Sequence, residues 1–467
     1  MNLDKGASAE EAPQLARSLL SRHVSMIAIG GIIGAGLFVG SSTSIATVGP
    51  AVIVSYLLAG LIVLLVMRML SEMAVAVPGV QSFPEFARVG LGDWAGFMSG
   101  WLYWYFWVVV VAIEAIAGAA IIRLWLPAFQ VWEIGVVLMA ALTAVNLLSA
   151  RLFGEFEFWF SSLKVGAIIA FIVIAASFAF GVTSPAGPTF SNLSDHGGFA
   201  PFGWVAMLAG VTSVIFALTG AEIATVAAAE SADPARTIAR ISVTVAVRIL
   251  IFYILSVALI VSVVPWTSII PGQSPFATAL VAMNVPGAAH IMNAIVLVAV
   301  LSCLNSGLYV TSRVLFALAA RGDAPQSLVA VGRRRVPARA ILVGSLFSYG
   351  ALAAAIVSPQ TVFSFLVNAS GAIMLAIYLM IAAAQLRLRG QLEREAPERL
   401  TIRMWFHPWG SILAIIGIVA VMLAMAVIPA LASQFYASLI VIAIVGAAFL
   451  GLRRYRRTRS ADTSLAV

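Results

Sequence analysis

The feature that most constrains this chain is a succession of apolar segments, each long enough to cross a membrane as a helix. A transmembrane helix needs roughly 20 mainly apolar residues. Such segments lie at 24–46, 50–70, 98–122, 131–149, 157–181, 203–228, 241–264, 287–312, 339–357, 361–385, 409–430 and 434–452. They are too long and too continuously apolar for the strands of a membrane barrel. The sequence therefore predicts an all-α integral membrane protein with twelve transmembrane helices.

The composition supports this class. Of the 467 residues, 62% are hydrophobic and only 10% are charged, whereas soluble globular proteins carry about 25% charged residues. A chain this long and apolar cannot cover its surface with polar side chains. The single cysteine, Cys303, excludes an intramolecular disulfide. No metal-ligand cluster, nucleophile–base pair or phosphate-binding loop is evident, so we expect no cofactor and no enzyme activity.

The positions of the arginines predict how the helices are oriented. The net charge of +8 could suggest nucleic acid, but the arginines concentrate in the tails and in every second loop, with Arg123 as an exception. The positive-inside rule then places both termini in the cytoplasm, and the basic charge can contact anionic lipid rather than nucleic acid. We assign the N-terminal tail 1–22, the loop 387–408 and the basic tail 453–467 to the cytoplasmic side.

The stretch GGIIGAGLFVG, residues 30–40, is dense in glycine. A dinucleotide fingerprint needs G-x-G-x-x-G between a strand and a helix, whereas here Gly34 and Gly36 are followed by Gly40, one residue too late and within an apolar span. Two interpretations remain. Gly30/Gly34 and Gly36/Gly40 are G-x-x-x-G pairs that let helices pack closely, or the helix is interrupted and exposes backbone N–H groups to a ligand.

A second interruption is predicted five helices later, in IFALTGAEIATVAAAE, where the Thr-Gly-Ala-Glu sequence 219–222 lies mid-span. Two interrupted helices in corresponding positions are typical of transporters built from inverted repeats. The repeats would occupy residues 23–182 (helices 1–5) and 203–386 (helices 6–10), with helices 11–12 at 409–452. Because half-helix N-termini suit a substrate carboxylate, the pair of interruptions favours a ligand site over packing alone.

Three ionisable residues are predicted at membrane depth, where charges are costly and generally functional. They are Glu114, Lys164 and Glu222. Lys164 is one of only two lysines in the chain. Since a desolvated lysine can lose its proton whereas arginine stays charged, Lys164 is suited to proton coupling; the alternative is a structural ion pair, with Glu157 or with a carboxylate of another helix. For Glu114 and Glu222, a role in the site or in gating and a structural pairing are both open.

Several further features have a structural and a functional interpretation. The aromatic run 101–107 is typical of an interfacial belt, although some members could line a substrate path. Phe216, directly before the second interruption, could close over a ligand. Cys303 either packs in the core or lines a cavity. Segment 313–328 can continue the eighth helix as an amphipathic helix, either on the membrane surface or in a gating contact.

Five segments together resemble the bacterial amino-acid permeases of the APC superfamily. They are MIAIGGIIGAGLFVGSSTSIATVGPAVIVSYLLAGLIVLLVMRMLSEMAV, SFPEFARVGLGDWAGFMSGWLYWYFWVVVVAIEA, FEFWFSSLKV, FALTGAEIATVAAAESADPARTI and LNSGLYVTSRVLFALAARGDAPQSL. They follow the expected order over nearly the whole chain. Within the family, the aromatic run with its IEA and the SCLNSGLY sequence most resemble 4-aminobutyrate (GABA) permeases. Permeases for aromatic amino acids, proline, lysine, and D-alanine, D-serine or glycine share the same framework.

The resemblance implies a LeuT-like fold of two inverted five-helix repeats plus two C-terminal helices. It places the substrate carboxylate on the backbone amides of Ile33, Gly34, Ala35 and Gly36. It places the substrate amine at backbone carbonyls around Phe216, Ala217 and Thr219. Lys164 matches the helix 5 lysine that occupies the place of a sodium ion in proton-coupled relatives, and Glu222 is the second candidate for proton coupling.

GABA carries its amine three methylenes from its carboxylate, so its amine would need a more distant acceptor, for which Glu114 is a candidate. Cys303 is included among the substrate-site residues.

We therefore expect a symporter in the bacterial cytoplasmic membrane that takes up GABA or a related small amino acid together with protons, by alternating access. The expected partners are the amino acid, protons and lipid, with no nucleic acid. Alternatives within the class are another specificity (aromatic, proline, or D-alanine, D-serine and glycine) or an amino-acid exchanger, which needs no proton gradient. A channel lacks a filter-like motif, and a membrane enzyme lacks a catalytic constellation.

Overall fold

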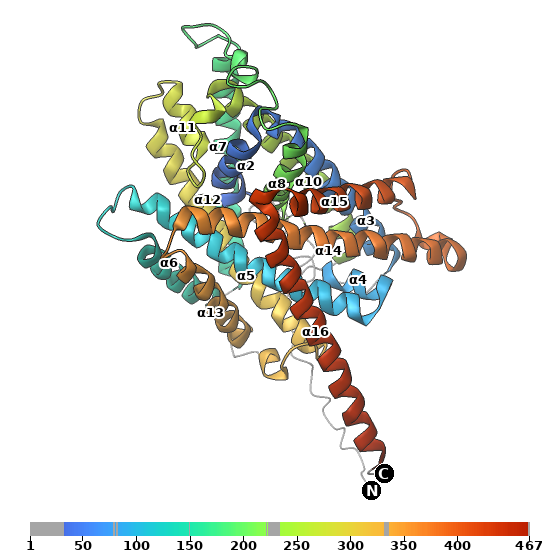
Figure 1. Cartoon of the computed structure of the whole chain (residues 1–467). Coiled ribbons are helices and arrows are strands. Elements are labelled where there is room, and N and C mark those ends of the chain that lie inside the picture. The colour runs from blue at the N-terminus through green and yellow to red at the C-terminus, as the bar shows by residue number, and fades with distance from the viewer. Residues whose placement is uncertain are drawn as a thin grey trace.

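The computed structural model describes residues 32–77, 80, 83–148, 150–220, 222, 234–330 and 336–465. Within these ranges the chain is helical and forms no strand, which confirms the all-α class. The helices pack into a bundle from which the C-terminal helix α16 projects (Figure 1). The principal helices are η1 (Gly36–Gly40), α2 (Ser41–Val48), η2 (Gly49–Ala51), α3 (Val52–Ala76), α4 (Phe83–Leu91), α5 (Asp93–Arg123), α6 (Val131–Asn146), α7 (Ala150–Ala179), α8 (Trp204–Leu218), α10 (Pro234–Val263), α11 (Pro275–Ala282), α12 (Ala288–Ala320), α13 (Ala338–Ala354), α14 (Pro359–Glu395), α15 (Trp409–Val427) and α16 (Pro429–Leu465).

Eight helical segments of the described chain are long and apolar enough to cross a membrane. They are Gly36–Ala76, Asp93–Arg123, Glu157–Ala179, Ala246–Val263, Ala288–Ala320, Pro359–Glu395, Trp409–Val427 and Pro429–Thr458. The helices α6, α8 and α13 are apolar but shorter. Every one of the twelve predicted spans overlaps a described helix. The first two share the apolar segment Gly36–Ala76, within which Gly49 at φ +73° changes the direction of the chain.

The structure corrects several helix limits. Helices α14 and α16 continue to Glu395 and Leu465, well past the predicted ends at 385 and 452, so parts of the predicted loop and tail are helical. The expectation of an amphipathic helix over 313–328 is wrong beyond Ala320. There α12 ends, and a turn with Gly322 at φ +74° leads into a 3₁₀ turn at Gln326–Val329. Apolar periodicity does not register such a turn, because the glycine alone reverses the chain.

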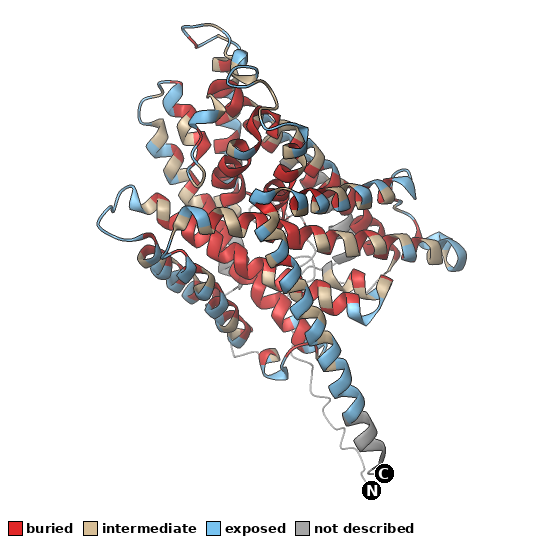
Figure 2. Ribbon diagram, viewed as in Figure 1, coloured by how far each residue is buried: buried red, intermediate tan, exposed pale blue. Residues whose placement is uncertain are grey.

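Burial separates the central helices from the outer ones. In the most apolar stretch of α5, 83% of residues are buried, whereas in α16 the share is 11%. Figure 2 shows α5 almost entirely buried and α16 largely exposed. Both helices are apolar over most of their surface, so in a membrane α5 packs against protein and α16 faces lipid. Residues on α5 are therefore well placed to form an internal site.

A buried ion pair ties α3 to α14 and to the segment that precedes α15. The carboxylate of Glu72 accepts hydrogen bonds from Arg389 Nη1 at 2.5 Å, Gln385 Nε2 at 2.7 Å and the Met404 N–H at 2.5 Å. The side chains of Glu72 and Arg389 are only 2% and 6% exposed. A buried carboxylate requires such partners because desolvation otherwise makes its charge unfavourable.

A second charged cluster joins α4, α12 and α16. Asp323, which follows α12, pairs with Arg88 of α4 and accepts from Arg456 Nη2 of α16 at 3.1 Å. The indole N–H of Trp101 donates to the backbone carbonyl of Asp323 at 3.1 Å. The long α16 is thus anchored to the end of α12 by a side chain near its own C-terminus.

Candidate functional site

The first predicted interruption is present in the described part of its helix. Ile33 and Gly34 adopt non-helical backbone, and a π-helical turn begins at Gly36. The N–H of Gly34 donates to the Ile32 carbonyl at 3.1 Å, which is a turn contact rather than a helical one. Residues 30 and 31, also part of the predicted stretch, lie outside the described residues.

The described chain leaves the helix where the second interruption is predicted. Helix α8 ends at Leu218, Thr219 is extended with φ −67° and ψ 141°, and Gly220 has φ +126°. Only glycine adopts that last conformation without strain. Residue 221 and residues 223–233, which complete the predicted span, lie outside the described residues.

The two interrupted helices touch through small residues. A β-carbon built on Gly36 would lie 2.7 Å from the Cα of Ala217, and one on Gly40 would lie 3.8 Å from the ring of Phe216. The hydroxyls of Ser44 and Ser213 bond each other at 2.7 Å further along the same contact. Close packing through Gly36 and Gly40 and an interrupted helix therefore coexist, although they were considered as alternatives from the sequence.

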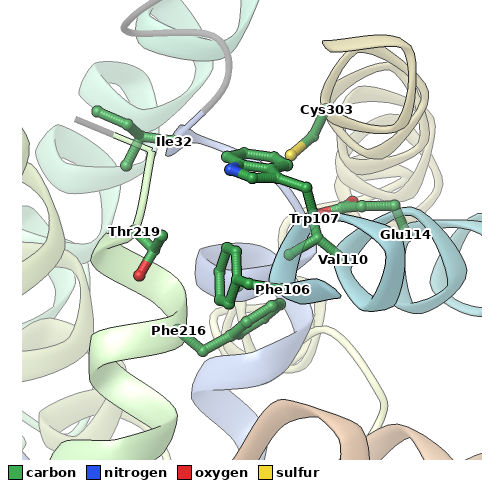
Figure 3. Close-up of a pocket in the computed structure, with 9 residues that line it drawn as sticks. Ile32, Phe106, Trp107, Val110, Glu114, Phe216, Thr219 and Cys303 are labelled. Atoms are coloured by element: carbon green, nitrogen blue, oxygen red, sulfur yellow. The ribbon is translucent and has the colours of Figure 1, made fainter. Parts of the chain in front are cut away.

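A small buried pocket lies where these helices meet α5 and α12. It is lined by Ile32, Gly36, Phe106, Trp107, Val110, Glu114, Phe216, Thr219 and Cys303. Figure 3 shows aromatic rings facing the space, with Thr219 on one side and Glu114 and Cys303 on the other. With the side chains in these positions the space is about the size of one water molecule, so a larger ligand has to displace lining side chains.

Glu114 is bound to the first interruption. The N–H of Ala35 donates to both carboxylate oxygens of Glu114, at 3.0 Å each. Both residues are buried, with 0% and 1% of their surface exposed. Gly34 lies directly against Glu114 and Cys303, because a β-carbon on it would come within 2.6 Å of Glu114 Oε1 and of the Cys303 Cβ. The carboxylate thus satisfies a backbone donor that the interruption frees.

A tyrosine of α10 holds the same interruption from another side. The hydroxyl of Tyr253 donates to the Ile32 carbonyl at 2.9 Å, and Tyr253 is fully buried beside the ring of Tyr56, at 6.4 Å between ring centroids. No sequence signal indicated Tyr253, since a single tyrosine in an apolar helix is typical of many packing positions.

Lys164 is placed in a buried ion pair with Glu157 of the same helix. Lys164 Nζ lies 3.7 Å from Glu157 Oε1, and both side chains are 0% exposed. The same oxygen accepts from Ser302 Oγ of α12 at 2.6 Å and from Ser161 Oγ at 3.3 Å. Glu157 is the partner that the sequence suggested, and a coupling role for Lys164 stays a prediction.

Glu222 is buried at the second interruption. Both of its carboxylate oxygens accept from the Gly220 N–H at 3.1 Å, and Tyr378 of α14 donates to one of them at 3.4 Å. Each of the two interruptions therefore has a glutamate bonded to a freed backbone N–H.

Five predicted site residues line the pocket directly: Gly36, Glu114, Phe216, Thr219 and Cys303. Four others form the backbone around it and do not line it: Ile33, Gly34, Ala35 and Ala217. Lys164 and Glu222 also lie outside its lining. The lining residues that the sequence analysis missed are Ile32, Phe106, Trp107 and Val110.

The aromatic run could have revealed two of these. Tyr103, Phe106 and Trp107 are at most 1% exposed and Trp104 is 7% exposed, so the belt interpretation is wrong for them. In the described part of the chain, no group of three or more His, Cys, Asp or Glu side chains could hold a metal ion.

A small internal pocket beside two breaks in the helices of an apolar bundle is typical of secondary transporters. Comparisons with known proteins identify the kind. The amino acid permease family model matches residues 23–464. The chain is 46% identical to the gamma-aminobutyric acid permease of Bacillus subtilis, over 96% of both chains. It is 44% identical to that of Escherichia coli, over 89% of this chain and 90% of the relative.

A further relative is the aromatic amino acid transport protein AroP of Corynebacterium glutamicum, which is 40% identical over 91% of this chain and 93% of its own. The chain therefore belongs to the amino acid permease family, as its motifs predicted, and is a multi-pass membrane protein. A permease carries its substrate across the membrane, so the family is one of transporters rather than enzymes.

Proposed function

We propose that this protein takes up 4-aminobutyrate together with protons across the bacterial cytoplasmic membrane. Twelve helices would cross the membrane as two inverted five-helix repeats plus α15 and α16, with both termini in the cytoplasm. The substrate would be reached from alternate sides as the repeats move around the interrupted helices. Relatives named for gamma-aminobutyric acid at 44–46% identity support this substrate.

One observation carries the proposal: opposite helix ends meet at one small pocket. The helical segment that starts at Gly36 presents its N-terminal end there, and α8 presents its C-terminal end at Thr219. The N-terminal end carries partial positive charge and the C-terminal end partial negative charge. A zwitterion with a carboxylate and an amine matches that pair. For GABA, Glu114 is the second acceptor that its distant amine can reach.

Uptake into proteoliposomes tests the proposal. Labelled GABA is offered with and without an inward proton gradient, and unlabelled proline, phenylalanine, lysine and D-alanine are added in excess as competitors. Gradient-driven accumulation that resists the competitors is expected. Accumulation of another amino acid instead of GABA would refute the substrate assignment, while stimulation by internal substrate without any gradient would indicate an exchanger.

An aromatic substrate is the second candidate. The pocket is lined by Phe106, Trp107 and Phe216, and a 40% identical relative is named for aromatic amino acids. The higher identity of 44–46% to relatives named for gamma-aminobutyric acid favours GABA. Strong inhibition of uptake by phenylalanine would reverse that preference.

Lys164 is proposed to bind and release the coupled proton. A proton drives transport only if the two access states bind it with different affinity, and the buried pair with Glu157 is a place where such a difference can arise. Lys164→Ala should abolish accumulation driven by a proton gradient, and Lys164→Arg, which keeps the charge but does not release its proton, should do the same. Lys5→Ala changes the only other lysine and serves as the control. Undiminished gradient-driven uptake in both Lys164 variants would overturn this role.

A further inference from the structure

The contact between Glu114 and Ala35 occupies a backbone N–H, that of Ala35, which the family resemblance assigns to the substrate carboxylate. The Ala35 N–H bonds both oxygens of Glu114 at 3.0 Å. Among the amides proposed for the substrate carboxylate, this one is therefore already bonded to a carboxylate of the protein. Glu114 also lines the pocket beside Gly36, so the protein's carboxylate and the substrate's carboxylate compete for the same place.

We propose that Glu114 is a built-in substitute for the substrate carboxylate, which leaves the Ala35 N–H when substrate binds and then pairs with the substrate ammonium. This inference rests on the proposed function. Of the two amine acceptors named above, it assigns the ammonium of GABA to Glu114.

Physical constraints require such an exchange. One N–H cannot donate a full hydrogen bond to two carboxylates, and two like charges placed together in a buried site repel strongly. A substrate carboxylate that takes the Ala35 N–H therefore displaces Glu114. The nine residues that line the pocket include no lysine, arginine or histidine. Lys164 acts electrostatically on Glu114 from outside this lining, where it is paired with Glu157.

The exchange predicts that an amino acid binds better than either of its halves. A carboxylate alone displaces Glu114 and leaves it buried without the Ala35 N–H as a donor, which is costly. An amine alone pairs with Glu114 but leaves the Ala35 N–H without an acceptor if Glu114 turns toward it. A ligand with both groups satisfies the two protein groups at once.

The test uses two fragments of GABA, butyrate and propylamine, each of which keeps one charged group. Their dissociation constants are measured from the concentration dependence of the melting temperature of the purified protein. Glu114→Gln removes the competing charge but keeps an oxygen that can accept from Ala35. Butyrate should then bind about tenfold tighter and propylamine about tenfold weaker, as expected for one charge-assisted hydrogen bond. Glu133→Gln, an equivalent change at the start of α6, should alter neither constant.

Other outcomes overturn the inference. Weaker binding of both fragments would mean that Glu114 only supports the fold of the pocket. Weaker binding of propylamine with unchanged butyrate would mean that Glu114 binds the amine without exchange, and unchanged binding of both would remove it from the site. Since butyrate probes any carboxylate site, this test stands even if uptake shows that GABA is not the substrate.

A second variant keeps the inference testable if Glu114→Gln does not fold. Ala35→Pro removes the N–H itself, and the backbone φ of −57° at Ala35 suits proline. Butyrate binding should fall about tenfold while propylamine binding is retained, because Glu114 is released to face the amine. Loss of propylamine binding together with butyrate, or retention of butyrate binding, would contradict the exchange.

Discussion

Replacing Gly36 with alanine tests whether the two interrupted helices need their present separation. A β-carbon on Gly36 would lie 2.7 Å from the Cα of Ala217, roughly 1 Å inside the optimal separation of two carbon atoms. The obstacle is backbone, so it cannot rotate away, and one helix must shift. Overpacking of this kind costs about 1–3 kcal/mol, which corresponds to about a 5- to 150-fold change in an equilibrium constant.

The shift would widen the contact that brings the helix ends to the pocket, so the cost should appear in substrate binding. We expect the dissociation constant for GABA, measured on purified protein, to rise in Gly36→Ala by up to about 150-fold, the limit reached when the whole cost falls on the bound state. The matched control is Gly350→Ala in α13, where a β-carbon meets nothing within 4 Å; its constant should equal that of the wild type. Wild-type affinity in Gly36→Ala, in protein with normal helical content, would refute the argument that this contact shapes the site.

Three further substitutions test separate contacts. Glu72→Ala leaves Arg389 buried without its main partner. The loss of about 3–5 kcal/mol of folding stability should lower the melting temperature markedly. An unchanged melting temperature would show that the pair adds nothing to stability. Tyr253→Phe removes the hydroxyl that bonds the Ile32 carbonyl at the first interruption. The loss of about 1 kcal/mol should weaken GABA binding about fivefold. Unchanged binding would show that the interruption keeps its shape without this bond. Arg456→Ala breaks a half-exposed ion pair with Asp323. Such a pair contributes about 0–1 kcal/mol to stability, so the melting temperature should barely change. A large drop would mean that the position of α16 depends on this pair.

The helical architecture could be predicted because each helix carries its signal within itself. An apolar run of about twenty residues is visible without knowledge of its neighbours, and every predicted span overlaps a described helix. Helix ends were less predictable. Helix α14 continues to Glu395 through a polar sequence, because Arg389 in that extension is paired with Glu72, more than 300 residues earlier in the chain. Such tertiary support leaves no trace in local hydropathy.

The candidate site was predictable to the same degree. Glycines and a Thr-Gly step indicated both interruptions, since they act locally on the backbone. The sequence left open whether members of the aromatic run 101–107 form a membrane belt or line a substrate path, because such a run does not reveal which of its members face protein. The bond between Glu114 and Ala35 joins residues 79 positions apart, so only the packing of α5 against the first interruption could show it.

The glutamates at the two interruptions show why structural and functional interpretations of buried charges are not exclusive here. Interrupting a helix inside an apolar bundle leaves backbone N–H groups that must find acceptors. Glu114 satisfies the Ala35 N–H and Glu222 satisfies that of Gly220. A carboxylate that performs this structural task has the same chemistry as the carboxylate of an amino acid. In the exchange proposed above, the residue that stabilises the first interruption is the one that a carboxylate-bearing substrate replaces, so at Glu114 the functional proposal follows from the structural role.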